Sequence, residues 1–160
     1  MTKLSFTRLS EIAPGEIANH MNDPRMSEHM PLLQHGWDGA RVAEFVAAKE
    51  ACWARDGLGH WAFLAEGRYV GWGGFQLEDG EWDFGVVLRP DAFGLGPLIT
   101  RQAIDFATRD ERIEYVVFLL APSRRSLGAL KRMGAREVAE VIFEGEAFLK
   151  FRLDTPNIAA

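Results

Sequence analysis

The stretch VVLRPDAFGLGPLI, residues 86–99, predicts a strand that passes through a glycine-containing turn directly into a helix. Gly94 and Gly96 let the backbone approach a ligand closely, and the amides and dipole of a helix N-terminus favour a phosphate. We therefore predict a pyrophosphate-binding loop at this turn. A purely structural turn is the alternative interpretation.

Competing glycine motifs are not present. The sequence contains no GxxxxGK[ST] motif and no GxGxxG motif after a strand, which disfavours ATP and NAD sites. The run GWGG, residues 71–74, lies inside a predicted strand, where glycines indicate a bulge or close packing. The loop at residues 89–96 is therefore the strongest candidate for a cofactor site.

Hydrophobic periodicity divides the rest of the chain into strands and helices around this loop. Upstream, it predicts a strand, two helices, and three antiparallel strands joined by hairpins at residues 4–9, 13–23, 38–56, 60–67, 68–78 and 81–88. Downstream, it predicts a helix, a doubly buried central strand, a helix and a hairpin at residues 97–108, 115–121, 123–134 and 138–154. The fold class expected is α/β (α+β), with a mixed, mostly antiparallel sheet and flanking helices.

Composition limits the kind of protein. A chain of 160 residues with 48% hydrophobic residues predicts one domain over residues 1–160. The single cysteine, Cys52, excludes an intramolecular disulfide and a four-thiolate zinc site, and we expect no metal. No signal peptide or membrane-length apolar run is present, so a soluble cytoplasmic protein is expected. A net charge of −5 with mostly scattered basic residues argues against a nucleic-acid partner.

Two motifs resemble those of a known superfamily. LRPDAFGLG, residues 88–96, is similar to the acetyl-CoA loop of the GNAT acetyltransferases, and SRRSLGALKRMGA, residues 123–135, is similar to the helix that follows their next strand. The order of elements from Leu4 to Leu153 is also the order of that superfamily. NDPRMSEHMPL, residues 22–32, followed by a long helix, resembles the branch that acetylates N-terminal alanines of ribosomal proteins and small-molecule amines.

The resemblance implies a fold in which two central parallel strands splay apart and hold acetyl-CoA between them. It also implies three sets of cofactor contacts: amides around Phe93, Gly94, Leu95 and Gly96 on the pyrophosphate, a strand edge at Val86, Val87 and Leu88 along the pantetheine arm, and Ser123 and Ser126 on the cofactor's other side. One arginine among Arg124, Arg125 and Arg132 would bind the 3′-phosphate. A strand amide near Val87 would stabilise the oxyanion.

Four positions depart from the superfamily pattern. Asp91 stands where the loop usually carries Gln or Arg, and Pro97 has no N–H for a phosphate. Ser123 replaces an Asn. Leu130 occupies the position at which many members carry the tyrosine that protonates the departing thiolate, and leucine has no proton to donate.

An acceptor for the proton of the incoming amine is the more pressing requirement, because only a neutral amine attacks. Asp83, in the stretch DFGVVL, stands where the related branch usually carries a Glu, and Glu81 points to the same face of the strand. His29 and His60 are further candidate bases. A solvated side chain is the alternative interpretation for Asp83.

The function expected is that of an acetyl-CoA-dependent N-acetyltransferase that acts by direct transfer in a ternary complex. The acceptor is a primary amine, either a peptide N-terminus or a small molecule, and Glu28, Glu81 and Asp83 favour a cationic one. A catalytically degenerate GNAT-like module that binds CoA or a protein is the rival hypothesis, and a longer acyl donor is a third. The resemblance permits a monomer or a homodimer.

Overall fold

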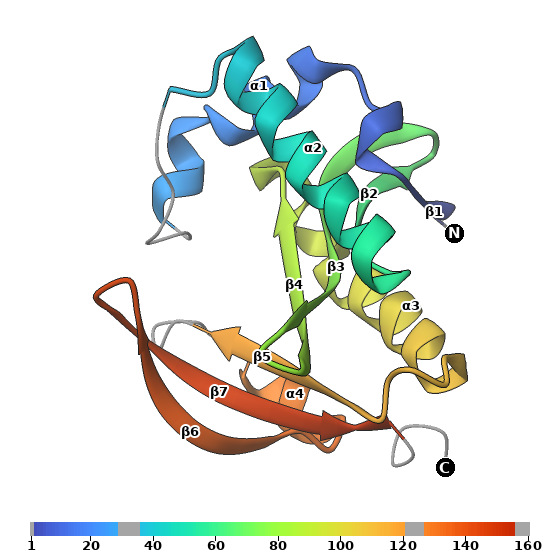
Figure 1. Ribbon diagram of the computed structural model, residues 1–160, viewed down its shortest axis with the longest axis vertical. Coiled ribbons are helices and arrows are strands. Elements are labelled where there is room, and N and C mark those ends of the chain that lie inside the picture. Colours follow the sequence, from blue (N-terminus) through green and yellow to red (C-terminus); the bar gives the residue numbers. More distant parts are fainter. Residues whose placement is uncertain (1, 29–35, 121–126, 156–160) are drawn as a thin grey trace.

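The computed structural model describes residues 2–28, 36–120 and 127–155. Seven strands form one sheet in the order β1-β2-β3-β4-β5-β7-β6, and β4–β5 is its parallel pair (Figure 1). The predicted fold class is thereby confirmed. The elements are β1 (Leu4–Thr7), η1 (Leu9–Glu11), α1 (Pro14–Met21), η2 (Pro24–Glu28), α2 (Gly39–Asp56), β2 (His60–Ala65), β3 (Arg68–Glu78), β4 (Glu81–Leu88), η3 (Pro90–Leu95), α3 (Gly96–Arg109), β5 (Tyr115–Leu120), α4 (Leu127–Arg132), β6 (Arg136–Phe143) and β7 (Glu146–Asp154).

The three predicted hairpins form as expected. Each turn is an acidic residue followed by glycine, and both residues of each pair have positive φ. The pairs are Glu66-Gly67, Asp79-Gly80 and Glu144-Gly145. Positive φ at both central positions is the geometry of the tight turn whose twist matches that of paired strands. The pairings β2–β3, β3–β4 and β6–β7 follow from these turns.

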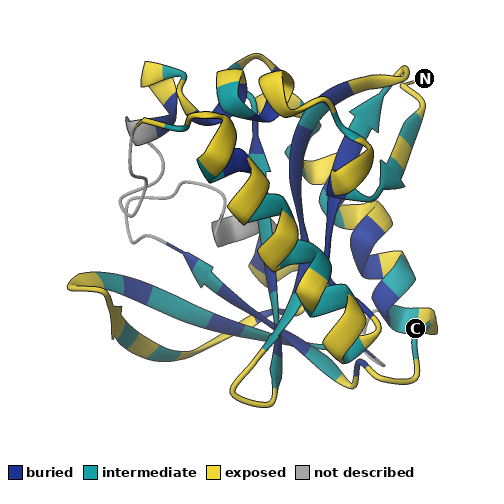
Figure 2. Ribbon diagram, turned by 45° about the horizontal axis from the view of Figure 1, so that its top comes forward, coloured by how far each residue is buried: buried dark blue, intermediate teal, exposed yellow. Residues whose placement is uncertain are grey.

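Two apolar clusters pack on opposite faces of the sheet. The larger cluster joins strand residues such as Phe75 and Phe84 to Ile99 of helix α3. The smaller cluster joins Trp72 of β3 to Val42 of helix α2 and to residues of α1. Figure 2 shows the buried central strands between α2, whose outer surface is exposed, and α3. A side chain on β3 or β4 therefore faces either α2 or α3.

The glycine run in β3 reflects close packing against β4. A Cβ atom at Gly73, where φ is 154°, would collide with the Gly85 carbonyl oxygen and lie 2.9 Å from the Val86 Cα. A Cβ atom at Gly71 would collide with the Val87 carbonyl oxygen in the same way. A bulge adjoins the run, because Phe63 pairs with Gly71 whereas Leu64 pairs with Tyr69. The structure therefore shows both features predicted for the GWGG run, a bulge and close packing.

Local structure differs from prediction in three places. The strand predicted over residues 4–9 ends at Thr7, and Leu9 begins the 3-10 helix η1. No helix or strand is predicted between residues 23 and 38, but Pro24–Glu28 forms the short 3-10 helix η2. The predicted glycine turn after β4 is the 3-10 helix η3, which leads directly into α3. Helices η2 and η3 both begin at a proline, whose fixed φ is already suited to a helical turn. Among the described helices, none is long and apolar enough to cross a bilayer.

We predict that Gly73→Ala lowers the free energy of unfolding by about 3 kcal/mol, because the new methyl group meets backbone atoms that cannot move away. Chemical denaturation measures the change. Gly15→Ala is the matched control, since its Cβ atom meets nothing within 4 Å and its site lies in helix α1. Equal stability of the two variants would contradict close packing of β3 on β4.

Candidate active site

Strand β4 pairs with one neighbouring strand along its whole length and with the other along a short length. It pairs with β3 from Glu81 to Leu88. Within the described residues it pairs with β5 only at Trp82↔Val116 and Asp83↔Val117, and the two strands then diverge (Figure 1). The edge of residues 84–88 is thus available to an extended ligand that adds itself as a strand. The predicted splay of the parallel pair is confirmed.

The predicted cofactor residues of β4 lie along this edge, with alternating side chains. Leu88 is buried in the cluster on the α3 face, and Val86 packs against the same cluster. Val87 packs instead against the cluster that contains Trp72, on the face of α1 and α2. Asp83 shares the face of Val87, since side chains two residues apart along a strand point the same way. One face of β4 therefore packs against the cluster on the side of α3. The other face packs against the cluster on the side of α1 and α2 at Val87, and it also carries Asp83.

The glycine loop follows directly at the end of this edge. A Cβ atom at Gly94 would meet nothing within 4 Å, and one at Gly96 would meet only the Leu88 side chain, at 3.8 Å. Neither glycine adopts a positive φ. No packing requirement explains glycine at position 94, so the open surface there suits close approach of a ligand. The Gly96 amide donates to the Phe93 carbonyl and the Ala92 amide donates to the Arg89 carbonyl, so both amides have partners within the protein.

Three arginines lie near the loop, from η2, from β3 and from the residue that follows β4. Arg25 of η2 donates to the Asp91 carboxylate at 3.0 Å and also pairs with Asp23, so the unexpected acidic residue in the loop has a basic partner. A hollow of about 540 Å³ adjoins the loop, and its charged lining residues are Arg68, Arg89 and Asp91. The Arg89 guanidinium lies 5.1 Å from the Tyr69 ring centroid and donates to the Glu16 carbonyl. Positive charge thus accompanies the loop.

The two acidic candidates on β4 differ in their partners. Glu81 accepts from the Lys150 ammonium at 2.5 Å and from the Tyr115 hydroxyl at 3.0 Å. The hydrogen bond from Lys150, followed by that from Tyr115, holds the pKa of Glu81 below its usual range against the opposing effect of burial. Glu81 is therefore a weak proton acceptor, and its predicted catalytic role stays a prediction.

The pKa of Asp83, unlike that of Glu81, lies above its usual range. Its side chain is largely shielded from water, and no ion pair or side-chain hydrogen bond reaches its carboxylate from the described parts of the chain. Burial raises the pKa of Asp83 to about 7, and the charge of Glu78 adds to this effect while Lys150 and Lys49 oppose it. A carboxyl group with a pKa near neutrality is suited to accept and release protons. Asp83 also stands where β4 leaves β5.

Three further residues near Asp83 are missed by the sequence analysis or undervalued in it. Lys49 of α2 donates to the Gln76 Oε1 atom at 3.0 Å, and Gln76 is the cross-strand partner of Asp83. His60 is buried, and burial together with the charge of Lys49 lowers its pKa well below the usual range. A signal for Lys49 exists in the sequence, because it falls four residues after Phe45 and three after Val46, inside the apolar stripe of the helix.

Several predicted residues lie outside the described part of the chain. Ser123 and Ser126 are among them, as are Arg124, Arg125 and His29. Their predicted roles stay predictions. Leu130, by contrast, is described in helix α4 and is buried in the cluster on the α3 face. Its side chain is part of the core, and it supplies no proton donor.

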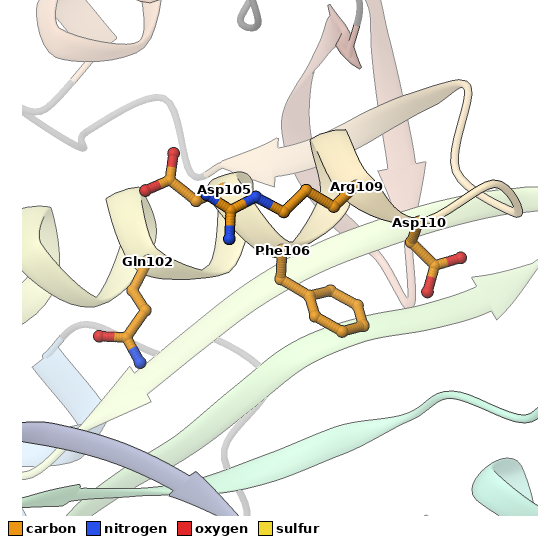
Figure 3. A pocket seen from close by; sticks show the side chains of 5 residues that line it. All are labelled: Gln102, Asp105, Phe106, Arg109 and Asp110. Atoms are coloured by element: carbon orange, nitrogen blue, oxygen red, sulfur yellow. The ribbon is translucent and has the colours of Figure 1, made fainter.

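A second hollow, of about 350 Å³, lies along the C-terminal half of α3 (Figure 3). Its lining side chains are Gln102, Asp105, Phe106, Arg109 and Asp110. Phe106 packs with Trp61 and Phe75 on the α3 side of the sheet, opposite the face of Asp83. This hollow holds none of the predicted site residues and is not part of the candidate site.

Solved structures of acetyltransferases share this fold. A spermidine N-acetyltransferase from Vibrio cholerae in complex with CoA and spermine is 10% identical, covers 99% of this chain and 98% of its own, and has a TM-score of 0.77. An acetyltransferase from Agrobacterium tumefaciens is 19% identical over 96% and 94% of the two chains, with a TM-score of 0.72. The aminoglycoside acetyltransferase AAC(6')-Ib in complex with coenzyme A is 12% identical over 99% and 98%, with a TM-score of 0.76.

Comparison of the sequence with family profiles identifies the family of this chain. No curated protein sequence matches the chain. The family profile described as "Acetyltransferase (GNAT) domain" matches residues 5–136, which extend from β1 to the first residue of β6. That match covers the diverging strands, the glycine loop and the residues around Asp83. The chain therefore belongs to the GNAT acetyltransferase family.

Proposed function

We propose that this protein transfers the acetyl group of acetyl-CoA directly to a primary amine while both are bound. The observation that carries the proposal is Asp83, a shielded carboxyl group with a pKa near neutrality at the point where β4 and β5 diverge. Family membership supports the donor. The solved relatives named for CoA with spermine and for coenzyme A with kanamycin support amines as the class of acceptor.

The residues present fit acetyl-CoA. The edge of β4 at Val86, Val87 and Leu88 is not paired with β5 and suits the amide-bearing pantetheine arm. Loop amides around Phe93, Gly94 and Leu95 precede the N-terminus of α3 and suit a pyrophosphate, which the nearby positive charge of Arg68 and Arg89 also favours. When bound, acetyl-CoA supplies an acetyl group activated as a thioester.

Asp83 is the proposed general base. In its carboxylate form it accepts a proton from the incoming ammonium or amine, directly or through one water molecule. Glu78 raises the pKa of Asp83, and Lys49 and Lys150 lower it, so the surrounding charges set the pH at which the base becomes active. An amide on the edge of β4 near Val87 is the proposed donor to the oxyanion.

Leu130 provides no acid for the departing thiolate, because a leucine side chain has no donor and this one is buried in the core. Thiols ionise at moderate pH, with a pKa of about 8.5 in the case of cysteine, so the thiolate is a tolerable leaving group that water reprotonates. The same observation is what favours the rival function, a non-catalytic module that binds CoA.

Acetyl-CoA is predicted to raise the thermal unfolding midpoint, since a ligand at 100 times its dissociation constant adds about 2.7 kcal/mol of stability. Gly94→Leu should abolish this rise by filling the open surface of the loop. The midpoint of the ligand-free variant should match that of the wild type, because a Cβ atom there meets nothing within 4 Å. An unchanged acetyl-CoA shift in Gly94→Leu would exclude the loop as the cofactor site.

Transfer to an amine is predicted to rise with pH through about 7, as Asp83 loses its proton. Asp83→Asn should remove this limb of the kcat/KM profile and lower the rate about 100-fold. Glu78→Gln removes a negative charge that raises the pKa of Asp83, so it should move the limb to lower pH. Steady-state kinetics between pH 5.5 and 8.5, roughly the range a shifted carboxyl group spans, measure both effects.

The stability of Asp83→Asn provides an independent check. A carboxyl group with a raised folded-state pKa destabilises the fold as pH rises above its unfolded-state pKa, because its buried charge must then be accommodated. Asp83→Asn should therefore melt at a higher temperature than the wild type at pH 8, about one unit above the pKa of the carboxyl group.

Full acetyl-CoA binding by the wild type without transfer to any amine would favour the non-catalytic module instead.

A further inference from the structure

On the face of the sheet that carries Asp83, the paired residues Gly74 and Gly85 carry no side chain. His60, Gly74 and Gly85 form one row across β2, β3 and β4. The neighbouring rows on the same face carry Trp72 with Val87 on one side and Gln76 with Asp83 on the other. A Cβ atom at Gly85 would meet nothing within 4 Å, whereas one at Gly74 would lie 2.7 Å from the Trp61 ring, so the open position is at Gly85. The sheet therefore leaves an open position between Asp83 and Val87, beside the diverging strands.

Lys49 extends from helix α2 toward this position. Its ammonium lies 4.9 Å from the Trp72 ring centroid and 5.6 Å from that of Phe45, and it donates to Gln76 at 3.0 Å. Trp72 and Gln76 belong to the two rows that border the open position, so the ammonium lies over it. Burial lowers the pKa of Lys49. No carboxylate of residues 2–28, 36–120 or 127–155 forms an ion pair with this ammonium, which leaves a shielded charge that a ligand can pair with.

His60 provides an independent sign of an incomplete site. It is 9% exposed, and its Nδ1 atom has no hydrogen-bond partner. Its ring lies 5.5 Å from the Trp72 ring. Buried polar groups in native proteins are almost always hydrogen-bonded, and a neutral imidazole retains one N–H donor. A second polar group, in the same row as the open position, therefore lacks the partner that a ligand could supply.

The charges around this position suit a zwitterion. Lys49 and Asp83 influence each other's pKa, yet no ion pair joins them in the part of the chain described here. Glu81, one of the acidic residues expected to favour a cationic acceptor, forms an ion pair with Lys150. The charge of Glu78 also acts on both groups, and its carboxylate accepts from the Gln76 amide at 2.8 Å. Lys49 and Asp83 are the cation and the titrating carboxyl group that border the open position.

We propose that the acceptor is a small amino acid or a similar compound, whose carboxylate binds the Lys49 ammonium while its amine lies next to Asp83. This inference rests on the proposed function and names its substrate class. In the transfer, the amine nitrogen forms a bond to the acetyl carbon and the C–S bond of the thioester breaks. The proton of the amine passes to Asp83, and the thiolate that leaves is protonated by water.

The test uses matched pairs of acceptors: glycine and glycinamide, β-alanine and β-alaninamide, and γ-aminobutyrate and its amide. The kcat/KM ratio of acid to amide is measured for the wild type and for Lys49→Met, so that intrinsic differences between amines cancel. For at least one pair, the wild-type ratio should exceed the Lys49→Met ratio by at least about tenfold, the loss expected for a charge-assisted hydrogen bond.

Control variants separate this role from a structural one. Arg55→Met removes an exposed cation from the same helix and should keep the wild-type ratio. Lys49→Gln is a second neutral variant, and both Lys49 variants should keep the acetyl-CoA-induced rise in melting temperature. Transfer to amides and polyamines with a ratio unaffected by Lys49→Met overturns the inference and leaves the proposed function intact. Binding of acetyl-CoA with no transfer to any amine overturns both.

Discussion

The short pairing between β4 and β5 is the constraint on which the candidate site depends. β4 pairs with β3 along its full length, and β5 pairs with β7. Within the described residues, the two halves of the sheet therefore pair only at Trp82 and Asp83 of β4. Beyond these positions the backbone of β4 needs another partner. The glycine run of β3 contributes, because it lets β3 lie close against β4 and hold that strand in place.

The electrostatics of the site show how neighbours on one strand acquire different chemistry. Glu81 and Asp83 point to the same face, yet Lys150 and Tyr115 bind Glu81 and stabilise its charge. Asp83 has no such partner among the described residues, and burial raises its pKa to about 7. The difference between a structural carboxylate and a candidate base is thus set by side chains from β5 and β7, far away in the sequence.

Much of this architecture could be predicted from local patterns. The three hairpins follow from residue–glycine pairs that adopt positive φ, and the doubly buried β5 follows from a continuous apolar run. The glycine loop after β4 was located correctly, although its 3-10 geometry was not. Lys49 was missed because a lysine on a helix is ordinarily solvated, and its environment depends on which strands the helix covers.

By itself, the sequence determined the order of the elements, their hairpin connections and the position of the glycine loop, because these depend on interactions between near neighbours in the chain. The tertiary structure alone decided where β4 leaves β5, which carboxyl group of β4 has no ion pair among the described residues, and that Lys49 meets Gln76, the cross-strand partner of Asp83. These features depend on contacts between residues 27 to 69 positions apart. Such contacts arise only when packing brings α2, β3, β4 and β7 together.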